Sequence, residues 1–245
     1  MLTIVLLTLS ILTTRSQDVT CDSIDNEEDI HLKGVFLHGL GDTPKGWAFL
    51  NDQNFANVDW HRPAAPIRTI SFKKGVEMTG WFDLWNFPVD SDSKDDESGI
   101  LESVKVIHSI LDDLIDSGVS SQDIFVGGFS QGGAVAMLAT YMYSKPLAGC
   151  ICLSGWLQLR SRFDTLLNEV NMKTPLFWGH GSRDNKVLVD TLEIGVEAMK
   201  QAGLTSIDSH EYENLKHLIS SEEMSDLVEW INLVRRSRGG GGSSS

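Results

Sequence analysis

The sequence predicts a single α/β domain built on a mostly parallel central sheet with helices on both faces. Three observations lead to this prediction: strand and helix patterns alternate along the chain, the strand patterns are short apolar runs, and a glycine-rich turn joins one strand directly to a helix. With 245 residues, 41% of them hydrophobic and 22% charged, the chain has the size and composition of one ordinary globular domain.

The predicted strands cover residues 34–38, 123–127, 149–153, 175–179 and 207–212. The predicted helices cover residues 99–117, 131–143 and 187–201, and a final helix follows Ser220, with Glu223 completing a capping box. Within the first helix, the apolar residues Ile100, Val104, Ile107, Leu111 and Leu114 recur at helical spacing. Since parallel strands end at one edge of a sheet, a ligand is expected at their carboxyl ends.

The two ends of the chain differ from the domain itself, which is predicted over residues 30–236. Residues 1–14 carry no charge and are mostly apolar, so residues 1–16 are predicted to be a signal peptide. A first buried strand is the alternative for this run, which is too short to span a bilayer. Residues 237–245 end in a glycine and serine tract, which predicts a disordered tail.

Charge and cysteine content exclude several classes of protein. The chain has 34 acidic and 20 basic side chains, a formal net charge of −14, which repels nucleic acid. Its three cysteines form no CxxC motif, so neither a disulfide framework nor a zinc site is predicted. Cys150 and Cys152 lie in an apolar run and are expected to be small buried core residues. No metal and no organic cofactor is implied.

The strongest local signal is the run from Gly128 to Gly132, GFSQG, between a predicted strand and a predicted helix. A G-x-S-x-G nucleophile elbow requires this context, because strand and helix approach so closely that side chains at the two glycines would collide. The turn lifts the Ser130 hydroxyl clear of the sheet. Ser130 is therefore the candidate nucleophile, and it needs a base.

The candidate base is a histidine that follows Ser130 in the chain. His180 lies at the end of an apolar strand, and His210 lies inside the last predicted strand. His217 lies in a short loop just before the final helix, where a base at the carboxyl edge of the sheet must be. His217 is therefore the predicted base.

The candidate acid is Asp184, in the loop that follows the predicted strand 175–179. Its expected role is to hold His217 in the right tautomer and to stabilise the imidazolium. Asp190 competes for this role, but it lies within the following predicted helix.

Two backbone donors are predicted to stabilise an oxyanion. One is the Gln131 N–H, at the start of the helix after Ser130. The other is the Leu40 N–H in the run from His38 to Asp42, HGLGD, where flanking glycines let the backbone turn inward.

Aromatic residues are concentrated between positions 81 and 87, in an irregular stretch that contains Trp81, Phe82, Trp85 and Phe87. One interpretation is an acyl-binding wall or lid near Ser130, formed by Trp81, Phe82 and Trp85. The other interpretation is a loop that packs on the core.

With HGLGD, GFSQGG, HGSRD and His217 assembled, the chain resembles the acyl-protein thioesterase and carboxylesterase family of α/β hydrolases, which includes enzymes described as lysophospholipases. The resemblance runs from about Gly34 to Arg235 and also takes in the runs RPAAP (62–66), GWFD (80–83) and LSGWL (153–157). It implies an α/β-hydrolase fold, the triad Ser130, Asp184 and His217, and an oxyanion hole at Leu40 and Gln131. The implied substrates are S-palmitoylated cysteines of proteins, with lysophospholipids and simpler esters as alternatives.

The chain departs from the family pattern in two loops and at its beginning. Asp184 is followed by Asn-Lys-Val where the family often has Pro-Val-Val, and Leu215-Lys216 precedes His217 where the family often has a nearby glycine. Family members that act on cytoplasmic protein tails need no signal peptide. The compartment is therefore secretory if residues 1–16 act as a leader, and cytoplasmic otherwise.

The leading hypothesis is a serine hydrolase that cleaves acyl thioesters or esters, as an acyl-protein thioesterase does. A secreted carboxylesterase or lysophospholipase is the alternative within this class. A non-catalytic binding protein on the same fold is the alternative from another class. The expected partner is an acylated protein or a lipid or ester substrate. No stable membrane span is predicted for the chain itself, and its oligomeric state stays open.

Overall fold

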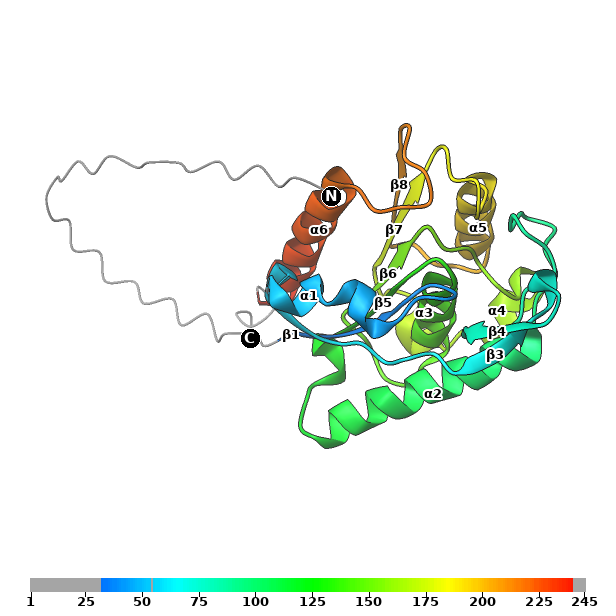
Figure 1. Cartoon of the computed structure of the whole chain (residues 1–245). Coiled ribbons are helices and arrows are strands. Elements are labelled where there is room, and N and C mark those ends of the chain that lie inside the picture. The colour runs from blue at the N-terminus through cyan, green and yellow to red at the C-terminus, as the bar shows by residue number, and fades with distance from the viewer. Residues whose placement is uncertain (1–31, 54, 240–245) are drawn as a thin grey trace, which may run out of the picture.

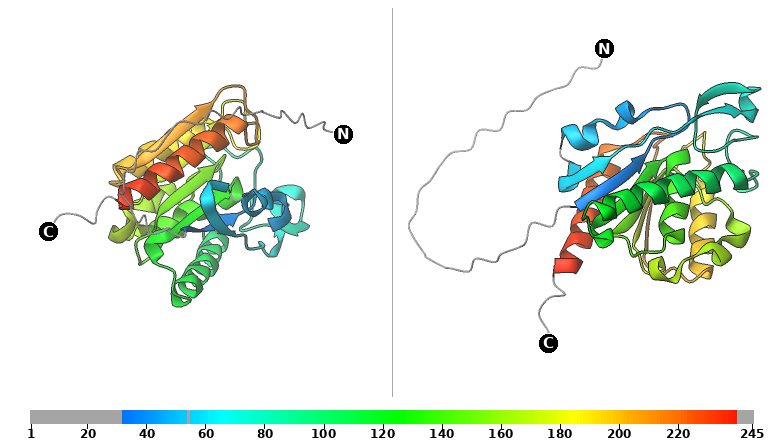
Figure 2. Two further views of the ribbon diagram at one scale, coloured as in Figure 1. Left: turned by 90° about the vertical axis from the view of Figure 1, so that its left-hand side faces the viewer. Right: turned by 90° about the horizontal axis from the view of Figure 1, so that it is seen from below.

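A computed structural model describes residues 32–53 and 55–239, in which a sheet of six parallel strands has the order β2-β1-β5-β6-β7-β8 (Figure 1). The strands of this sheet are β1 (Leu32–Leu37), β2 (Val58–His61), β5 (Ile124–Phe129), β6 (Gly149–Leu153), β7 (Leu176–Gly181) and β8 (Ile207–Tyr212). A separate antiparallel hairpin consists of β3 (Ile67–Ile70) and β4 (Val76–Thr79), and it projects beyond the main sheet in the right-hand view of Figure 2.

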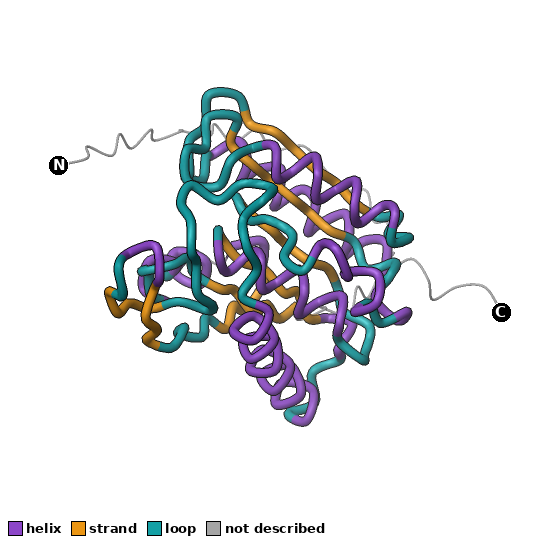
Figure 3. The backbone as a smooth tube through the Cα atoms, turned by 90° about the vertical axis from the view of Figure 1, so that its right-hand side faces the viewer, coloured by secondary structure: helices purple, strands orange, loops and turns teal. Residues whose placement is uncertain are grey.

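Helices cover both faces of the sheet, as the sequence predicts (Figure 3). The helices are α1 (Phe49–Asp52), α2 (Glu97–Asp116), α3 (Gln131–Met142), α4 (Phe163–Leu166), α5 (Asp190–Gln201) and α6 (Ser221–Gly239). Residues of α2, α3, α4 and α5 share one hydrophobic core with the sheet, and residues of α1 and α6 share the other. Because side chains alternate across a strand, Phe125 of β5 faces the α6 side while Ile124 and Val126 face the α3 side.

The five predicted strands correspond to β1, β5, β6, β7 and β8, and the predicted α/β class is confirmed. The edge strand β2 was not predicted, because only Val58 and Trp60 of its four residues are buried and the pattern is short. Helix α5 begins at Asp190 rather than at residue 187. Val187 instead forms an isolated bridge with Val89, which holds the preceding residues extended.

The two described cysteines confirm the core prediction, since Cys150 and Cys152 are buried on β6 without a disulfide. Burial raises the pKa of the Cys150 thiol to about 12 and also raises that of Cys152. Both sulfurs therefore stay protonated and act as small apolar groups.

The ends of the described region bear on three sequence predictions. The predicted signal peptide, residues 1–16, lies outside the described residues. Helix α6 continues through residues 237–239, which were predicted to belong to the tail, and Arg238 contacts Asp123 at 3.5 Å there. No helix between residues 32 and 239, position 54 aside, is both long and apolar enough to cross a bilayer.

Candidate active site

Ser130 lies on a strained turn between β5 and α3, as the elbow prediction requires. Its φ is 55° and its ψ is −121°, a combination that costs on the order of 1–3 kcal/mol for a residue with a side chain. A Cβ on Gly132 would lie 2.1 Å from the Leu37 carbonyl oxygen, and one on Gly128 would lie 2.4 Å from the Gly132 carbonyl carbon. Both glycines are therefore required by close approach of backbone to backbone.

The three residues predicted to act together lie in a hydrogen-bonded row. The His217 Nε2 atom is 2.9 Å from the Ser130 Oγ, and the His217 Nδ1 atom is 2.6 Å from the Asp184 Oδ2. A carboxylate accepts hydrogen bonds, so Nδ1 carries the proton of a neutral imidazole and Nε2 accepts from the serine hydroxyl. The geometry suits Ser130 to nucleophilic attack with His217 as general base.

Asp184 is buried and fully supplied with donors. Its Oδ1 accepts from the backbone N–H groups of Lys186 and Val187, at 2.8 Å and 3.0 Å. Burial by itself raises the pKa of Asp184, but hydrogen bonds from His180 and His217 outweigh burial and lower it well below its usual range. Asp184 is therefore an anion at every pH at which the imidazole of His217 could act as a base.

His180 is a neighbour of the acid, and the sequence indicated it only as a competing candidate for the base. It is fully buried, and its Nε2 atom lies 3.0 Å from the Val187 carbonyl oxygen and 3.4 Å from the Asp184 Oδ2. Because both neighbours are acceptors, Nε2 carries the proton and points at the acid loop. The four-residue spacing between His180 and Asp184 was the available signal, but it carries no meaning until the turn after β7 is known.

The other two competing residues lie away from Ser130. His210 lies on β8, where its ring stacks on Phe177 and its Nε2 atom is 2.9 Å from the Asp208 carboxylate. Asp190 begins α5 and is exposed.

Backbone hydrogen bonds join the loop of the acid to the loop of the base. The Arg183 N–H donates to the Leu215 carbonyl at 2.8 Å, and the Asn214 N–H donates to the Ser182 hydroxyl at 2.8 Å. A Cβ on Gly181 would lie 2.4 Å from the Leu215 carbonyl oxygen, so a glycine is needed where the loops touch. The two loops therefore hold Asp184 and His217 as one unit.

One predicted oxyanion donor directly follows Ser130 in the chain, and the other lies in the loop after β1. Gln131 is the first residue of α3 and Leu40 follows β1, and both line the same pocket as Ser130. Neither backbone N–H has a hydrogen-bond acceptor in the described part of the chain. Leu40 and Gln131 therefore stay the candidate oxyanion donors.

A pocket of about 440 Å³ opens beside Ser130 and His217, within the range of ~300–1,000 Å³ typical of small-molecule sites. Its apolar lining comes from Leu40, Phe72, Met78, Leu84, Phe87, Val89, Phe129, Trp156 and Val187. Asp42, Lys73 and Lys186 add charged groups. The hairpin β3–β4 supplies part of this wall, and no strand signal in the sequence had indicated that hairpin.

The aromatic stretch contributes to this pocket through Leu84 and Phe87, and not through the three residues predicted to bind an acyl chain. Trp81 and Phe82 are fully buried in the core, and Trp85 is 40% exposed. None of these three residues lines the pocket beside Ser130. The packing interpretation therefore describes Trp81 and Phe82.

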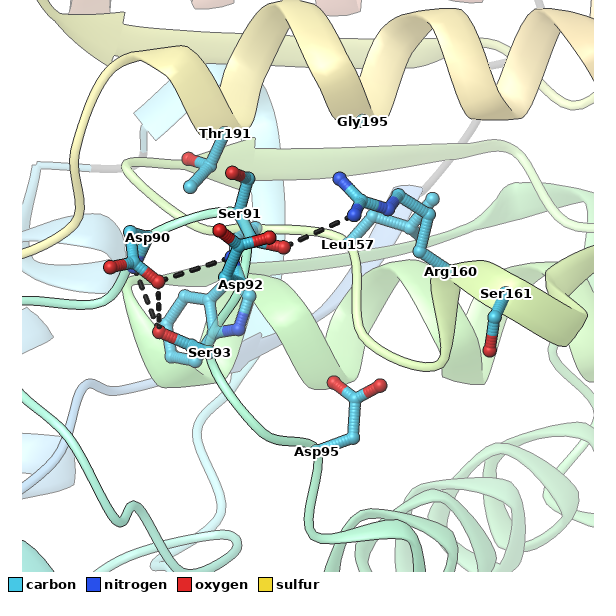
Figure 4. A pocket seen from close by; sticks show the side chains of 11 residues that line it. Asp90, Ser91, Asp92, Ser93, Asp95, Leu157, Arg160, Ser161, Thr191 and Gly195 are labelled. Atoms are coloured by element: carbon cyan, nitrogen blue, oxygen red, sulfur yellow. Dashed lines mark hydrogen bonds between the residues drawn. The ribbon is translucent and has the colours of Figure 1, made fainter.

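A second pocket, of about 270 Å³, shares Trp156 with the first and is lined mostly by polar groups (Figure 4). Asp90 and Ser93 hydrogen-bond to each other in it, and Arg160 donates to the Ser91 carbonyl at 3.1 Å. None of the residues predicted from sequence to form the active site lines this pocket.

Known proteins are similar to this chain in both sequence and fold. The family model described as Phospholipase/Carboxylesterase matches residues 20–235. Carboxylesterase SOBER1 of Arabidopsis thaliana is 34% identical over 209 residues, which cover 84% of this chain and 90% of the relative. Acyl-protein thioesterase 1 of Cryptococcus neoformans is 35% identical over 214 residues, covering 80% of this chain and 90% of that protein.

Solved structures agree with these matches. The crystal structure of Arabidopsis thaliana SOBER1 has a TM-score of 0.80 at 33% identity, and the match covers 84% of this chain and 99% of that one. The crystal structure of Zea mays acyl-protein thioesterase 2 has a TM-score of 0.74 at 27% identity, covering 83% and 94% of the two chains. The chain therefore belongs to the phospholipase/carboxylesterase family of α/β hydrolases.

Proposed function

We propose that this protein is a serine hydrolase of long-chain acyl thioesters and esters, and that acylated proteins are its substrates. The observation that carries the proposal is the hydrogen-bonded row of Ser130, His217 and Asp184, of which Ser130 and His217 line a pocket with an apolar wall. Relatives named carboxylesterase and acyl-protein thioesterase support ester and thioester hydrolysis alike.

The first half of the proposed reaction transfers the acyl group to the enzyme. The Ser130 Oγ attacks the acyl carbonyl carbon while the His217 Nε2 takes the hydroxyl proton. The carbonyl oxygen becomes an oxyanion, which the N–H groups of Leu40 and Gln131 stabilise. The tetrahedral intermediate then collapses, and the thiol or alcohol leaves with the proton from His217.

The second half returns the enzyme to its starting state. Water enters, gives a proton to His217 and attacks the acyl carbonyl carbon of the Ser130 ester. The same two N–H groups stabilise the second oxyanion, and collapse releases the fatty acid while Ser130 regains its proton from His217. Asp184 stays ionised throughout and stabilises the imidazolium in both halves.

The apolar part of the pocket is proposed to hold the acyl chain. Phe72 of the hairpin turn stacks on Phe87 with ring centroids 4.9 Å apart, which joins two separate segments into one wall. Burying an alkyl chain against such a wall contributes about 0.8 kcal/mol per CH₂. Lys186, part of the departure from the family pattern, places a cation on this lining, so the changed loop forms part of the pocket.

The test is a hydrolysis series from acetyl to palmitoyl, with each chain length presented as a paired ester and thioester. The proposal expects kcat/KM to rise with chain length, to be highest for long-chain thioesters, and to vanish in Ser130→Ala. A preference for short-chain esters would make the protein a general carboxylesterase and would contradict the long-chain assignment of the pocket.

One observation supports the alternative of a non-catalytic binding protein. A relative from Oryza sativa, 32% identical, is named probable inactive carboxylesterase. Covalent labelling separates the two classes. A fluorophosphonate should label the full chain at Ser130 and should not label Ser130→Ala, whereas a non-catalytic protein would stay unlabelled.

The compartment follows from residues 1–16, whose role as a signal peptide stays a prediction. N-terminal sequencing of protein recovered from a secreting host tests it. Cleavage near Ser16 would favour a secreted esterase or lysophospholipase, and an intact N-terminus would favour substrates inside the cell.

A further inference from the structure

Residues 79–82 touch both loops that carry the proposed oxyanion donors. They follow β4, which ends at Thr79, and Trp81 is fully buried. Their polar contacts include the His38–Asp42 loop on one side and Gln131 on the other. The segment therefore spans the space between the two donors.

On the side of the elbow, the bridge is the Gln131 side chain, which is fully buried. Its Oε1 accepts from the Trp81 N–H at 2.8 Å, and its Nε2 donates to the Phe82 carbonyl at 2.6 Å. Both polar ends of the amide are thus satisfied by the backbone of one segment. The residue that supplies one proposed donor is therefore fastened by its side chain at two points.

On the side of the Leu40 loop, the bridge is the Trp81 indole and the end of β4. The Trp81 Nε1 donates to the His38 carbonyl at 2.8 Å. The Gly41 N–H donates to the Thr79 carbonyl at 2.8 Å, and the Thr79 hydroxyl donates to the Asp42 carbonyl at 2.7 Å. Leu40 is therefore enclosed between anchored neighbours.

The loop has one backbone hydrogen bond of its own, from the Asp42 N–H to the Gly39 carbonyl at 3.2 Å, and the anchors from residues 79–81 add to it. Gly41 has a φ of +74°, and Gly39 adds further backbone freedom beside Leu40. An oxyanion donor acts only when it lies about 2.7–3.1 Å from the developing charge. A donor on the backbone can be held at that distance only by what holds the loop.

We infer that Trp81 is a positioning residue of the oxyanion hole, and that with the Gln131 side chain it fixes the spacing between the Leu40 and Gln131 N–H groups. Trp81 is suited to this task because its backbone N–H binds one loop and its indole N–H binds the other. Ser103 secures it from below by donating to the Trp81 carbonyl. The inference rests on the proposed function, which needs both donors.

The test compares Trp81→Phe with a matched variant in the full chain. Trp81→Phe keeps a buried aromatic ring but removes the indole N–H together with part of the ring volume, so the control must lose the same volume. Trp178→Phe is the control, since Trp178 is also fully buried and its Nε1 has no partner within the described region. Both variants are assayed well below their melting temperatures on an acyl ester and on the matched thionoester, in which sulfur replaces the carbonyl oxygen.

The inference expects kcat of Trp81→Phe to fall at least ~10-fold, because a full donor is worth about 10²–10³. KM should stay within about twofold, because the loss falls on the transition state. Sulfur is a weaker and larger acceptor, so the preference for the ester over the thionoester should also shrink. Trp178→Phe should keep both kcat and this preference.

Three outcomes would contradict the inference or its basis. A wild-type kcat in Trp81→Phe, or a lower kcat with an unchanged preference for the ester, would overturn the positioning role. If Trp81→Phe does not fold, Gln131→Met removes the other end of the bridge. The same two readouts, kcat and the preference for the ester, then test the positioning role. A wild-type chain without Ser130-dependent hydrolysis would overturn the proposed function, and the positioning role with it.

Discussion

Two buried carboxyl groups lie beside β7, and they have opposite surroundings. Asp184, in the loop after β7, accepts hydrogen bonds from two backbone N–H groups and from His217. Glu223, in the first turn of α6, is fully buried, and neither of its carboxyl oxygens has a hydrogen-bond partner in the described part of the chain.

The pKa values of these two groups move in opposite directions. Burial raises both, but at Asp184 the hydrogen bonds outweigh it and the pKa falls. At Glu223 burial raises the pKa to about 7, and the nearby charge of Asp226 adds to the rise. Partners rather than burial therefore decide which buried carboxyl stays charged.

The largest effect should come from removing the charge of the partnered group. Asp184→Asn is expected to lower kcat about 10⁴-fold, because an amide in place of the carboxylate favours the wrong tautomer of His217. Steady-state hydrolysis of an acyl ester measures this effect, with circular dichroism to show that the variant is folded. A kcat within tenfold of wild type would remove Asp184 from the proposed mechanism.

Glu223, the carboxyl group without a partner, should affect the free energy of unfolding rather than the catalytic rate. Folded Glu223 keeps its proton up to a pH of about 7, whereas an unfolded chain releases it near 4.5. Between these values the folded state binds more protons, so the free energy of unfolding falls as pH rises, and the loss is complete above about pH 7. The loss amounts to about 3 kcal/mol.

Urea unfolding at pH 5 and pH 8 tests this prediction. Glu223→Gln should be more stable than wild type at pH 8 and similar to it at pH 5. Glu222→Gln, at an exposed neighbouring position, should follow wild type at both values. Equal pH dependence of wild type and Glu223→Gln would show that Glu223 is not the buried acid described.

A smaller effect is expected where Glu223 meets β7. A Cβ on Gly179 would lie 2.3 Å from the Glu223 Oε1, so Gly179→Ala must displace the carboxyl group. The cost should be about 1–3 kcal/mol in thermal or urea unfolding. Combining Gly179→Ala with Glu223→Ala should recover most of it, and a purely additive double variant would argue against the contact.

The smallest effect concerns the support of Asp184. His180→Phe removes a donor that lies 3.4 Å from the Asp184 Oδ2. One weak bond to a charged group should be worth roughly tenfold in kcat, with Asp184 still ionised. A loss as large as that of Asp184→Asn would mean that His180 holds the acid loop together rather than assisting it.

The sequence predicted the parts of the site that local rules govern. Ser130 could be proposed because a strained turn between strand and helix demands glycine on both sides. Chain order and a place in loops at the carboxyl ends of strands then favoured Asp184 and His217, which the structure joins to Ser130 by hydrogen bonds. The capping box at Ser220 was half confirmed. The Ser220 hydroxyl accepts from the Glu223 N–H at 3.0 Å, but the Glu223 carboxyl makes no return bond.

What the sequence did not predict depends on contacts between distant segments. The hairpin turn at Phe72 meets Phe87 only because the chain folds back beside Ser130. For Trp81 the sequence left an acyl-binding wall and core packing open, and the structure buries its indole in the core with a bond to the His38 carbonyl. No periodicity or local motif specifies such pairings.

The most direct test of the central claim is mass spectrometry of the full chain after reaction with a fluorophosphonate. The account predicts one adduct, on the peptide that contains Ser130, absent from Ser130→Ala and formed far more slowly in Asp184→Asn. An unlabelled wild-type chain, or an adduct that persists in Ser130→Ala, would contradict the assignment of Ser130 as the nucleophile.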